Sequence, residues 1–342
     1  MPGTDGAPSP SPRDPSLHAA TGAAGGAPSD AAPPARRALV LTVALLAVVL
    51  WGGSPIATKL AVAELDPFAV GALRSLIGAL PAVAILAVLR LPFPRSGSGR
   101  GLLAVSSLCG FVVFPMLFSL ALQWTTAAHG GLALAILPLT TALIAAFFER
   151  RMPSRRWWLG AAVALAGTLL LIDRRFGLGS SGASVKGDLL VLLSCLAASA
   201  GYVTGGRAAR EIGARAVTFW GLALAGLPLL LATPLLIAPR DLGALSPSAW
   251  GALIYLGVMI SIVGYLGWYW ALAQGDMTRT ALVQFLQPAA SLLFAVVVLG
   301  EILSWPLLVA GAVIIAGVAL VQTGGPGAGR KSVPTPSKGA VS

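Results

Sequence analysis

The sequence predicts an all-α integral membrane protein with ten transmembrane helices, arranged as two inverted five-helix repeats. Three observations lead to this prediction: the composition, a series of long apolar segments, and sequence features that recur about 150 residues apart. Of the 342 residues, 56% are hydrophobic and only 10% are charged, whereas a soluble domain carries about 25% charged residues. Because ordinary globular packing cannot bury so much apolar surface, several membrane spans are expected.

Ten segments are long and apolar enough for helices that cross a bilayer, which takes about 20 mainly apolar residues per helix. None of them alternates apolar and polar residues as a strand of a membrane barrel would. The predicted spans are 38–58, 68–89, 101–122, 126–148, 157–172, 188–206, 216–237, 249–272, 279–299 and 303–322. The ends of the chain, 1–37 and 323–342, are rich in Pro, Ala, Gly and Ser and are predicted to be disordered.

The second half of the chain repeats features of the first half. PLTTALIAAFFE (138–149) and PAASLLFAVVVLGE (288–301) each begin with proline and end an apolar run with glutamate. WGGSPIATK (51–59) aligns with SAGYVTGGR (199–207) at nearly the same offset. A near-constant offset over five spans indicates a duplicated unit. The predicted units are a first repeat at 38–172, a linker at 173–187 and a second repeat at 188–322.

The number of spans per unit sets the orientation of the two repeats. Five is odd, so the second repeat must cross the membrane in the opposite direction to the first. The loop 149–156 carries four arginines, whereas 301–306 has no Lys or Arg, as expected for opposite sides. With a cytoplasmic N-terminus, seventeen Lys and Arg lie inside and five outside, so both termini are predicted to be cytoplasmic. Inverted repeats are characteristic of secondary transporters that bind substrate near the midplane between the repeats.

Arg74 is the most costly residue of the predicted spans, because it is a charge seven residues into a helix. An intramembrane charge is a candidate functional group, and a guanidinium in a cavity can bind a carboxylate or phosphate through two hydrogen bonds. The alternatives are that its side chain reaches the outer headgroups, or that it pairs with Glu64 or Asp66. Lys59, close to the end of the first span, is expected to extend towards the headgroups.

Polar and aromatic side chains follow one face of several spans. In the ninth span Gln284, Gln287 and Ser291 share a helical face, and exposing amides to lipid would cost several kcal/mol. These residues are expected to line a cavity or to hydrogen-bond between helices. The other candidate cavity residues are Trp51, Ser54, Thr58, Tyr202, Tyr265 and Trp268. Aromatic side chains with polar tips suit a small amphipathic ligand, and they also occur in interfacial belts.

Two prolines and two glutamates mark the fourth and ninth spans. Pro138 and Pro288 each remove a backbone donor, so each is expected to kink its helix, either beside a central cavity or for packing alone. Glu149 and Glu301 are expected to be boundary residues at the ends of these spans. Glu301 has no basic neighbour in sequence, so a tertiary partner or the N-terminus of the last helix is expected to bind it.

His129 lies near the outer end of the fourth span. A histidine changes charge near neutral pH when unperturbed, so His129 is expected either to pack with a hydrogen bond or to carry a coupling proton. Four small residues in the fifth and tenth spans are expected to allow close helix packing. They are Gly160, Gly167, Gly311 and Gly317.

On these motifs the chain resembles the drug/metabolite transporter superfamily, and specifically its EamA-like branch. The resemblance covers about residues 38–322 and is carried by the ten spans, by WGGSPIATK and by Arg74 in DPFAVGALRSLIGAL. It is also carried by LQWTTAAHGGLALAILPLTTALIAAFFERR and TALVQFLQPAASLLFAVVVLGE. The resemblance implies a multi-pass inner-membrane carrier of small metabolites, often an exporter, without catalytic residues.

We therefore predict a secondary transporter, and an exporter, of a small polar or amphipathic metabolite such as an amino acid. The sequence has no nucleotide-binding motif, so an ion or substrate gradient is expected to drive transport, with protons as a candidate coupling ion and no cofactor. The alternative is a membrane enzyme or flippase acting on a lipid-linked substrate, although the short loops hold few clustered acidic groups. The expected partners are a small-molecule substrate, the lipid bilayer and, as one candidate, a second copy of the chain. Nucleic acid is not expected, because the basic residues lie scattered in short gaps.

Overall fold

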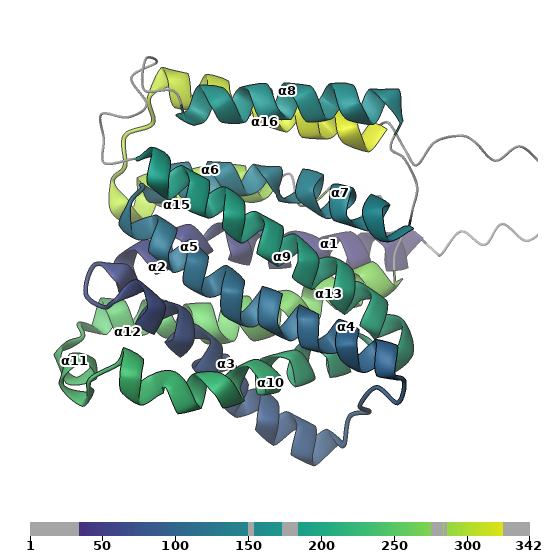
Figure 1. Ribbon diagram of the computed structural model, residues 1–342. Coiled ribbons are helices and arrows are strands. Elements are labelled where there is room, and N and C mark those ends of the chain that lie inside the picture. The colour runs from purple at the N-terminus through teal and green to yellow at the C-terminus, as the bar shows by residue number, and fades with distance from the viewer. Residues whose placement is uncertain (1–33, 150–153, 173–183, 275–282, 284–285, 324–342) are drawn as a thin grey trace, which may run out of the picture.

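The computed structural model describes residues 34–149, 154–172, 184–274, 283 and 286–323, and helices dominate these ranges (Figure 1). No strand occurs in them, so the all-α prediction is confirmed for the described part. Six helical stretches there are long and apolar enough to cross a membrane, namely Ala38–Val62, Pro67–Leu89, Gly97–Gln123, Val185–Ile212, Ala214–Leu236 and Pro247–Ala271. Shorter apolar helices cover Ala127–Thr141, Leu286–Leu299 and Trp305–Gly317. The predicted tails and linker lie largely outside the described residues.

The first span is interrupted near its middle. It consists of α1 (Pro34–Gly52) and α2 (Ser54–Val62), joined at Gly53. A Cβ added to Gly52 would come within 2.6 Å of the Ala290 Cβ, so glycine lets another helix approach the break closely. Pro55 lies in the first turn of α2, where its missing N–H has no intrahelical partner to lose. The segment 34–37, predicted as tail, belongs to α1.

Two spans contain a π-helical segment, and the two segments lie at corresponding places of the predicted repeats. The first such span consists of α4 (Gly97–Leu108), η2 (Cys109–Val113) and α5 (Phe114–Gln123). The other consists of α12 (Pro247–Ile254), η5 (Tyr255–Gly264) and α13 (Tyr265–Gln274). π-Helical turns inside α-helices occur often at functional sites, so both spans are candidates to border such a site.

The fourth predicted span is broken as well. It consists of α6 (Ala127–Ala133), the 3₁₀ turn η3 (Leu134–Ile136) and α7 (Leu137–Glu149). Pro138 is the second residue of α7, directly after the 3₁₀ turn. Thr140 donates a hydrogen bond to the Leu137 carbonyl at 3.0 Å, which gives the backbone near the proline a side-chain partner. Pro288, by contrast, is the third residue of α15 (Leu286–Leu299).

The other helices complete the bundle. They are α3 (Pro67–Leu89), α8 (Arg155–Ile172), α9 (Val185–Ile212), α10 (Ala214–Leu236), α11 (Pro239–Ala244) and α16 (Trp305–Thr323). Figure 1 shows α8 and α16 side by side along one flank, on the far side of the molecule from α3 and α10. The start of α1 and the end of α16 lie at the same end of the bundle.

Glycine explains the close approach of α8 and α16. A Cβ on Gly167 would come within 2.7 Å of the Ile314 backbone nitrogen, and one on Gly317 would overlap the backbone of Ala164. Gly311 faces the Leu132 side chain, where a Cβ would come within 2.9 Å. The prediction that these small residues allow close helix packing is confirmed for all three. Because lipid provides no hydrophobic driving force between helices, close backbone approach favours their association through van der Waals packing.

Each half of the chain supplies a carboxylate to a helix start in the other half. Ser96 is the N-cap of α4, and Glu211 accepts hydrogen bonds from its backbone N–H at 3.2 Å and its hydroxyl at 2.7 Å. Ser246 is the N-cap of α12, and Glu64 accepts bonds from its N–H at 2.8 Å and its hydroxyl at 2.5 Å. The two serines lie about 150 residues apart, as do the two glutamates. We call these contacts the cross-caps.

The Glu64 cross-cap makes a prediction about stability and pH. Hydrogen bonds from the Ser246 hydroxyl and N–H hold the pKa of Glu64 below its ordinary value of 4.5. Since the folded pKa is the lower one, ionised Glu64 stabilises the fold above about pH 4.5, and this stabilisation is lost as the pH falls through the folded value. Glu64→Gln should therefore lower the melting temperature in detergent slightly at pH 7 and less near about pH 3. Ser246→Ala removes the other partner of the contact. If the stability losses of Glu64→Gln and Ser246→Ala simply add in the double variant at pH 7, the proposed interaction is contradicted.

Candidate functional site

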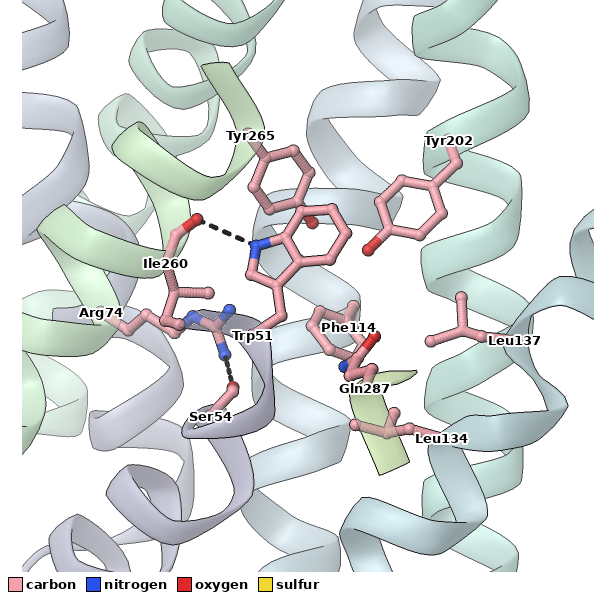
Figure 2. A pocket seen from close by; sticks show the side chains of 10 residues that line it. All are labelled: Trp51, Ser54, Arg74, Phe114, Leu134, Leu137, Tyr202, Ile260, Tyr265 and Gln287. Atoms are coloured by element: carbon pink, nitrogen blue, oxygen red, sulfur yellow. Dashed lines mark hydrogen bonds between the residues drawn. The ribbon is translucent and has the colours of Figure 1, made fainter. Parts of the chain in front are cut away.

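A small cavity lies between helices from both halves of the chain (Figure 2). Its volume is about 20 Å³, little more than a single water molecule requires. The lining residues are Trp51, Ser54, Arg74, Phe114, Leu134, Leu137, Tyr202, Ile260, Tyr265 and Gln287. Several come from the interruptions described above: Ser54 opens α2, Phe114 follows η2, Leu134 begins η3, and Tyr265 follows η5. The breaks in the helices therefore surround the cavity.

Arg74 supplies the positive charge of this cavity. It lies on α3 with its side chain only 3% exposed. One terminal nitrogen donates to the Ser54 hydroxyl at 3.4 Å, and the guanidinium lies 5.5 Å from the centre of the Phe114 ring. The aromatic face attracts the cation but does not accept its N–H bonds. The Nε atom is buried and has no hydrogen-bond partner among the described residues.

The acidic residues proposed as partners of Arg74 are engaged elsewhere. Glu64 binds Ser246, and Asp66 caps α3 by accepting bonds from the backbone N–H groups of Phe68 and Ala69. No carboxylate in the described part of the chain forms an ion pair with Arg74. The pairing alternative is therefore wrong, and the depth of burial contradicts a side chain that extends to the outer headgroups.

Aromatic rings form one wall of the cavity. Trp51 stacks on Tyr202, with ring centres 6.0 Å apart and planes within 10°, and its centre lies 5.3 Å from that of Tyr265. The indole N–H donates to the Ile260 carbonyl at 3.4 Å, which fixes the ring orientation (Figure 2). A wall of this kind offers apolar surface with a hydroxyl at the tip of each tyrosine.

The structure brings together six of the ten cavity candidates from the sequence. They are Trp51, Ser54, Arg74, Tyr202, Tyr265 and Gln287. Three others are buried but do not line the cavity. Thr58 lies one turn after Ser54, Trp268 lies 5.4 Å from the Trp51 ring, and Ser291 packs closely against Gly131. Gln284 lies outside the described residues, and so does the side chain of Glu149.

Four lining residues were missed by the sequence reasoning, namely Phe114, Leu134, Leu137 and Ile260. All are apolar, so they gave no polar signal inside an apolar span. Leu134 and Leu137 reach the cavity where the helix turns from α6 through η3 into α7. Pro138 was the available signal for that break, because it limits the preceding residues.

A second set of polar contacts surrounds the connection between α5 and α6, residues 122–129. Lys59 on α2 donates to the carbonyls of Leu122 and Thr125, each at 2.7 Å. Leu122 lies in the last turn of α5 and Thr125 follows the C-cap Trp124, so the ammonium lies at the end of this helix, where a cation is favourable. The Lys59 ammonium thus binds backbone oxygens of the bundle, and its extension towards the headgroups stays a prediction.

Glu301 binds the same connection at the start of α6. Its carboxylate oxygens accept bonds from the backbone N–H groups of Ala127 at 2.9 Å and Ala128 at 2.8 Å, at the start of α6. These donors have no intrahelical partner. A tertiary partner for Glu301 was expected and is confirmed, whereas the alternative, the N-terminus of the last helix, is wrong.

The chain is similar to a transporter family, to bacterial relatives and to a protein of known structure. The model of the EamA-like transporter family matches residues 38–173 and 185–323. The uncharacterized transporter YdeK of Bacillus subtilis (strain 168) is 33% identical over 278 residues, which cover 81% of this chain and 94% of that protein. The probable amino-acid metabolite efflux pump of Salmonella typhimurium (strain LT2) is 26% identical, over 81% of this chain and 92% of that protein. A chain of known crystal structure with 25% identity aligns with a TM-score of 0.58, over 82% of this chain and 94% of its own length.

Proposed function

Because this chain belongs to the EamA-like transporter family and is a multi-pass membrane protein, we propose that it is a secondary transporter that exports a small carboxylate-bearing metabolite, such as an amino acid. The observation that carries this proposal is Arg74, a buried guanidinium at the cavity with no acidic partner in the described part of the chain. A substrate carboxylate would supply the missing acceptors. The name of the Salmonella relative, an amino-acid metabolite efflux pump, agrees with this substrate class.

The remaining lining residues suit the other parts of such a substrate. Trp51, Tyr202 and Tyr265 offer an aromatic wall for an apolar side chain. Gln287, 7% exposed, offers an amide that can donate and accept. An amino acid combines a carboxylate, a polar amine and a compact side chain, so these features together favour it over a purely apolar compound.

The cavity volume favours a cycle with an occluded intermediate. Ligand pockets measure roughly 300–1,000 Å³, whereas this cavity holds about 20 Å³. A metabolite can enter only if the helices around it separate. The interruptions at Gly53, η2, η3 and η5 are the places where these helices can bend, as hinge motions require. We propose that alternate separation at the two ends gives access first to one side of the membrane and then to the other.

We further propose ten spans in two inverted repeats, 38–172 and 188–322, joined by a linker at 173–187 and inserted in the inner membrane with both termini in the cytoplasm. The corresponding π-helical segments and the two cross-caps support the duplication. The positions of the α1 start and the α16 end at one end of the bundle support termini on one side (Figure 1). Reporter fusions after 153 and after 303 test the inversion, and finding both reporters on the same side would refute it.

Counterflow in proteoliposomes tests the substrate class. Vesicles are loaded with one unlabelled solute, and exchange is followed with a labelled one. Leucine, leucinamide and isoamylamine form a matched series, because the second compound lacks only the negative charge and the third lacks the carboxyl group altogether; phenylalanine and glutamate widen the panel. We expect exchange of at least one amino acid and none of the matched amide or amine. Absence of any exchange would refute transport of these solutes, and equal exchange of the amine would refute the carboxylate requirement.

A further inference from the structure

A buried histidine–aspartate pair joins α6 to α9, away from the cavity. The Nδ1 atom of His129 lies 3.5 Å from Oδ1 of Asp188, and the two side chains are 5% and 4% exposed. Asp188 lies in the first turn of α9. It was not among the candidate residues from the sequence, because a charged residue is ordinary at the start of a predicted span. The only hydrogen bond from a side chain to Asp188 within the described residues comes from the Thr125 hydroxyl, at 3.1 Å to Oδ1.

The charge of this pair depends on the protonation of the imidazole. The His129 Nδ1 atom is buried and makes no hydrogen bond to any described residue. With a neutral imidazole the pair carries one negative charge, which is costly to hold away from water. Proton uptake by the imidazole makes both ring nitrogens donors, so that Nδ1–H faces the carboxylate and the two groups form an ion pair with no net charge. Histidine is the side chain suited to this exchange near neutral pH.

We propose that His129 and Asp188 bind the proton that drives transport, an inference that rests on the proposed transporter function. The charged groups on neighbouring elements are Lys59 on α2, Glu301 after α15 and Lys186 on α9. Lys59 binds the Thr125 carbonyl, Glu301 binds the N–H groups next to His129, and Lys186 lies 3.9 Å from the centre of the Trp124 ring.

The pair acts on the cavity through the 122–129 connection. Lys59, Asp188 and Glu301 all bind this connection, and so does Ser184, which donates to the Trp124 carbonyl at 2.6 Å. The connection leads into α6 and then into η3, which contributes Leu134 to the cavity. A change of charge at the pair thus alters the contacts that hold the start of a cavity-lining segment.

Proton binding can be measured without knowing the substrate. The chain has two histidines, His18 and His129, so His18→Gln leaves a single imidazole for NMR of ¹³C-histidine-labelled protein in nanodiscs. We expect its signal to change reversibly with pH, and this change to differ in Asp188→Asn. Glu64→Gln, which removes a carboxylate elsewhere, should leave the response of the imidazole unchanged. An imidazole signal that does not titrate, or that titrates alike in Asp188→Asn, would overturn the proposal.

Coupling is measured in proteoliposomes with the same amino-acid panel. The wild type is expected to accumulate solute against its gradient when a pH gradient is imposed. His129→Gln and Asp188→Asn should reduce this accumulation at least about tenfold while retaining exchange at equal pH, and Asp188→Glu, which keeps the carboxylate, should recover part of it. Full accumulation in Asp188→Asn would overturn the coupling role. If the wild type exchanges no solute, both the transporter proposal and the coupling role fail. If the wild type exchanges solute at equal pH but does not accumulate it under a pH gradient, only the coupling role fails.

Discussion

Replacing Arg74 with glutamine is expected to lower amino-acid counterflow at least about 100-fold. Each hydrogen bond to a charged group contributes about 1.5–3 kcal/mol, so losing a two-bond contact with a carboxylate corresponds to a factor of about 100 or more. Arg74→Lys keeps the charge but not the planar fork, and it should fall between the wild type and glutamine. Uptake of labelled leucine into leucine-loaded vesicles measures both effects.

The stability of the same variants separates binding from a structural role. Arg74 is buried and has no acidic partner among the residues that the structure describes, and a buried unpaired charge destabilises a fold. Arg74→Gln should therefore melt at the same temperature as the wild type or higher, while transport is lost. Arg156→Gln, at the exposed start of α8, is the matched control and should change neither quantity. Loss of folding in Arg74→Gln, or retained counterflow, would contradict a substrate-binding role.

Replacing Gly317 with valine is expected to destabilise the protein by about 3 kcal/mol, at the upper end of the cost of overpacking. A side chain there would overlap the backbone of Ala164 and lie within 2.8 Å of the Gly160 carbonyl oxygen. Backbone atoms cannot move aside as the end of a flexible side chain can, so α8 and α16 must separate. Thermal unfolding in detergent should show a melting temperature several degrees lower than that of the wild type.

Gly251→Ala and Gly206→Ala are the controls for the Gly317 variant. A Cβ at either position meets no atom within 4 Å, and alanine favours a helix over glycine by up to about 1 kcal/mol. Both variants should melt at or slightly above the wild-type temperature. A Gly317→Val protein as stable as these controls would show that the contact between α8 and α16 is not essential to the fold.

Much of the helical arrangement could be predicted from sequence, because the bilayer dictates the length and apolarity of a span. The predicted segment 68–89 corresponds closely to α3, and 216–237 to α10. The interruptions were harder to predict. The apolar run of the third span passes through η2 without a change in composition, so hydropathy cannot show where the backbone changes from α to π geometry. The count of ten spans stays a prediction.

The site could be predicted only in part, for a related reason. A polar or charged residue inside an apolar run is conspicuous, which is why Arg74 and Gln287 stood out. The partners of Lys59 and Glu301 could not be predicted, because the residues they bind are 63 and 174 positions away along the chain and nothing local encodes those distances. Asp188 was missed because a charge at the end of a span has an ordinary explanation as a boundary residue.

The cross-caps have a consequence for how the protein is made. The N-cap of α4 receives its carboxylate from Glu211, on a helix that follows it by more than a hundred residues. While the ribosome is still synthesising the first half, the start of α4 must wait in the membrane without this partner. This contact of the first half is therefore made only after α9, the first helix of the second half, has been synthesised. Glu64, by contrast, is already present when Ser246 is synthesised, so the first half can assist the folding of the second. The first half completes its own fold only when the second half supplies Glu211.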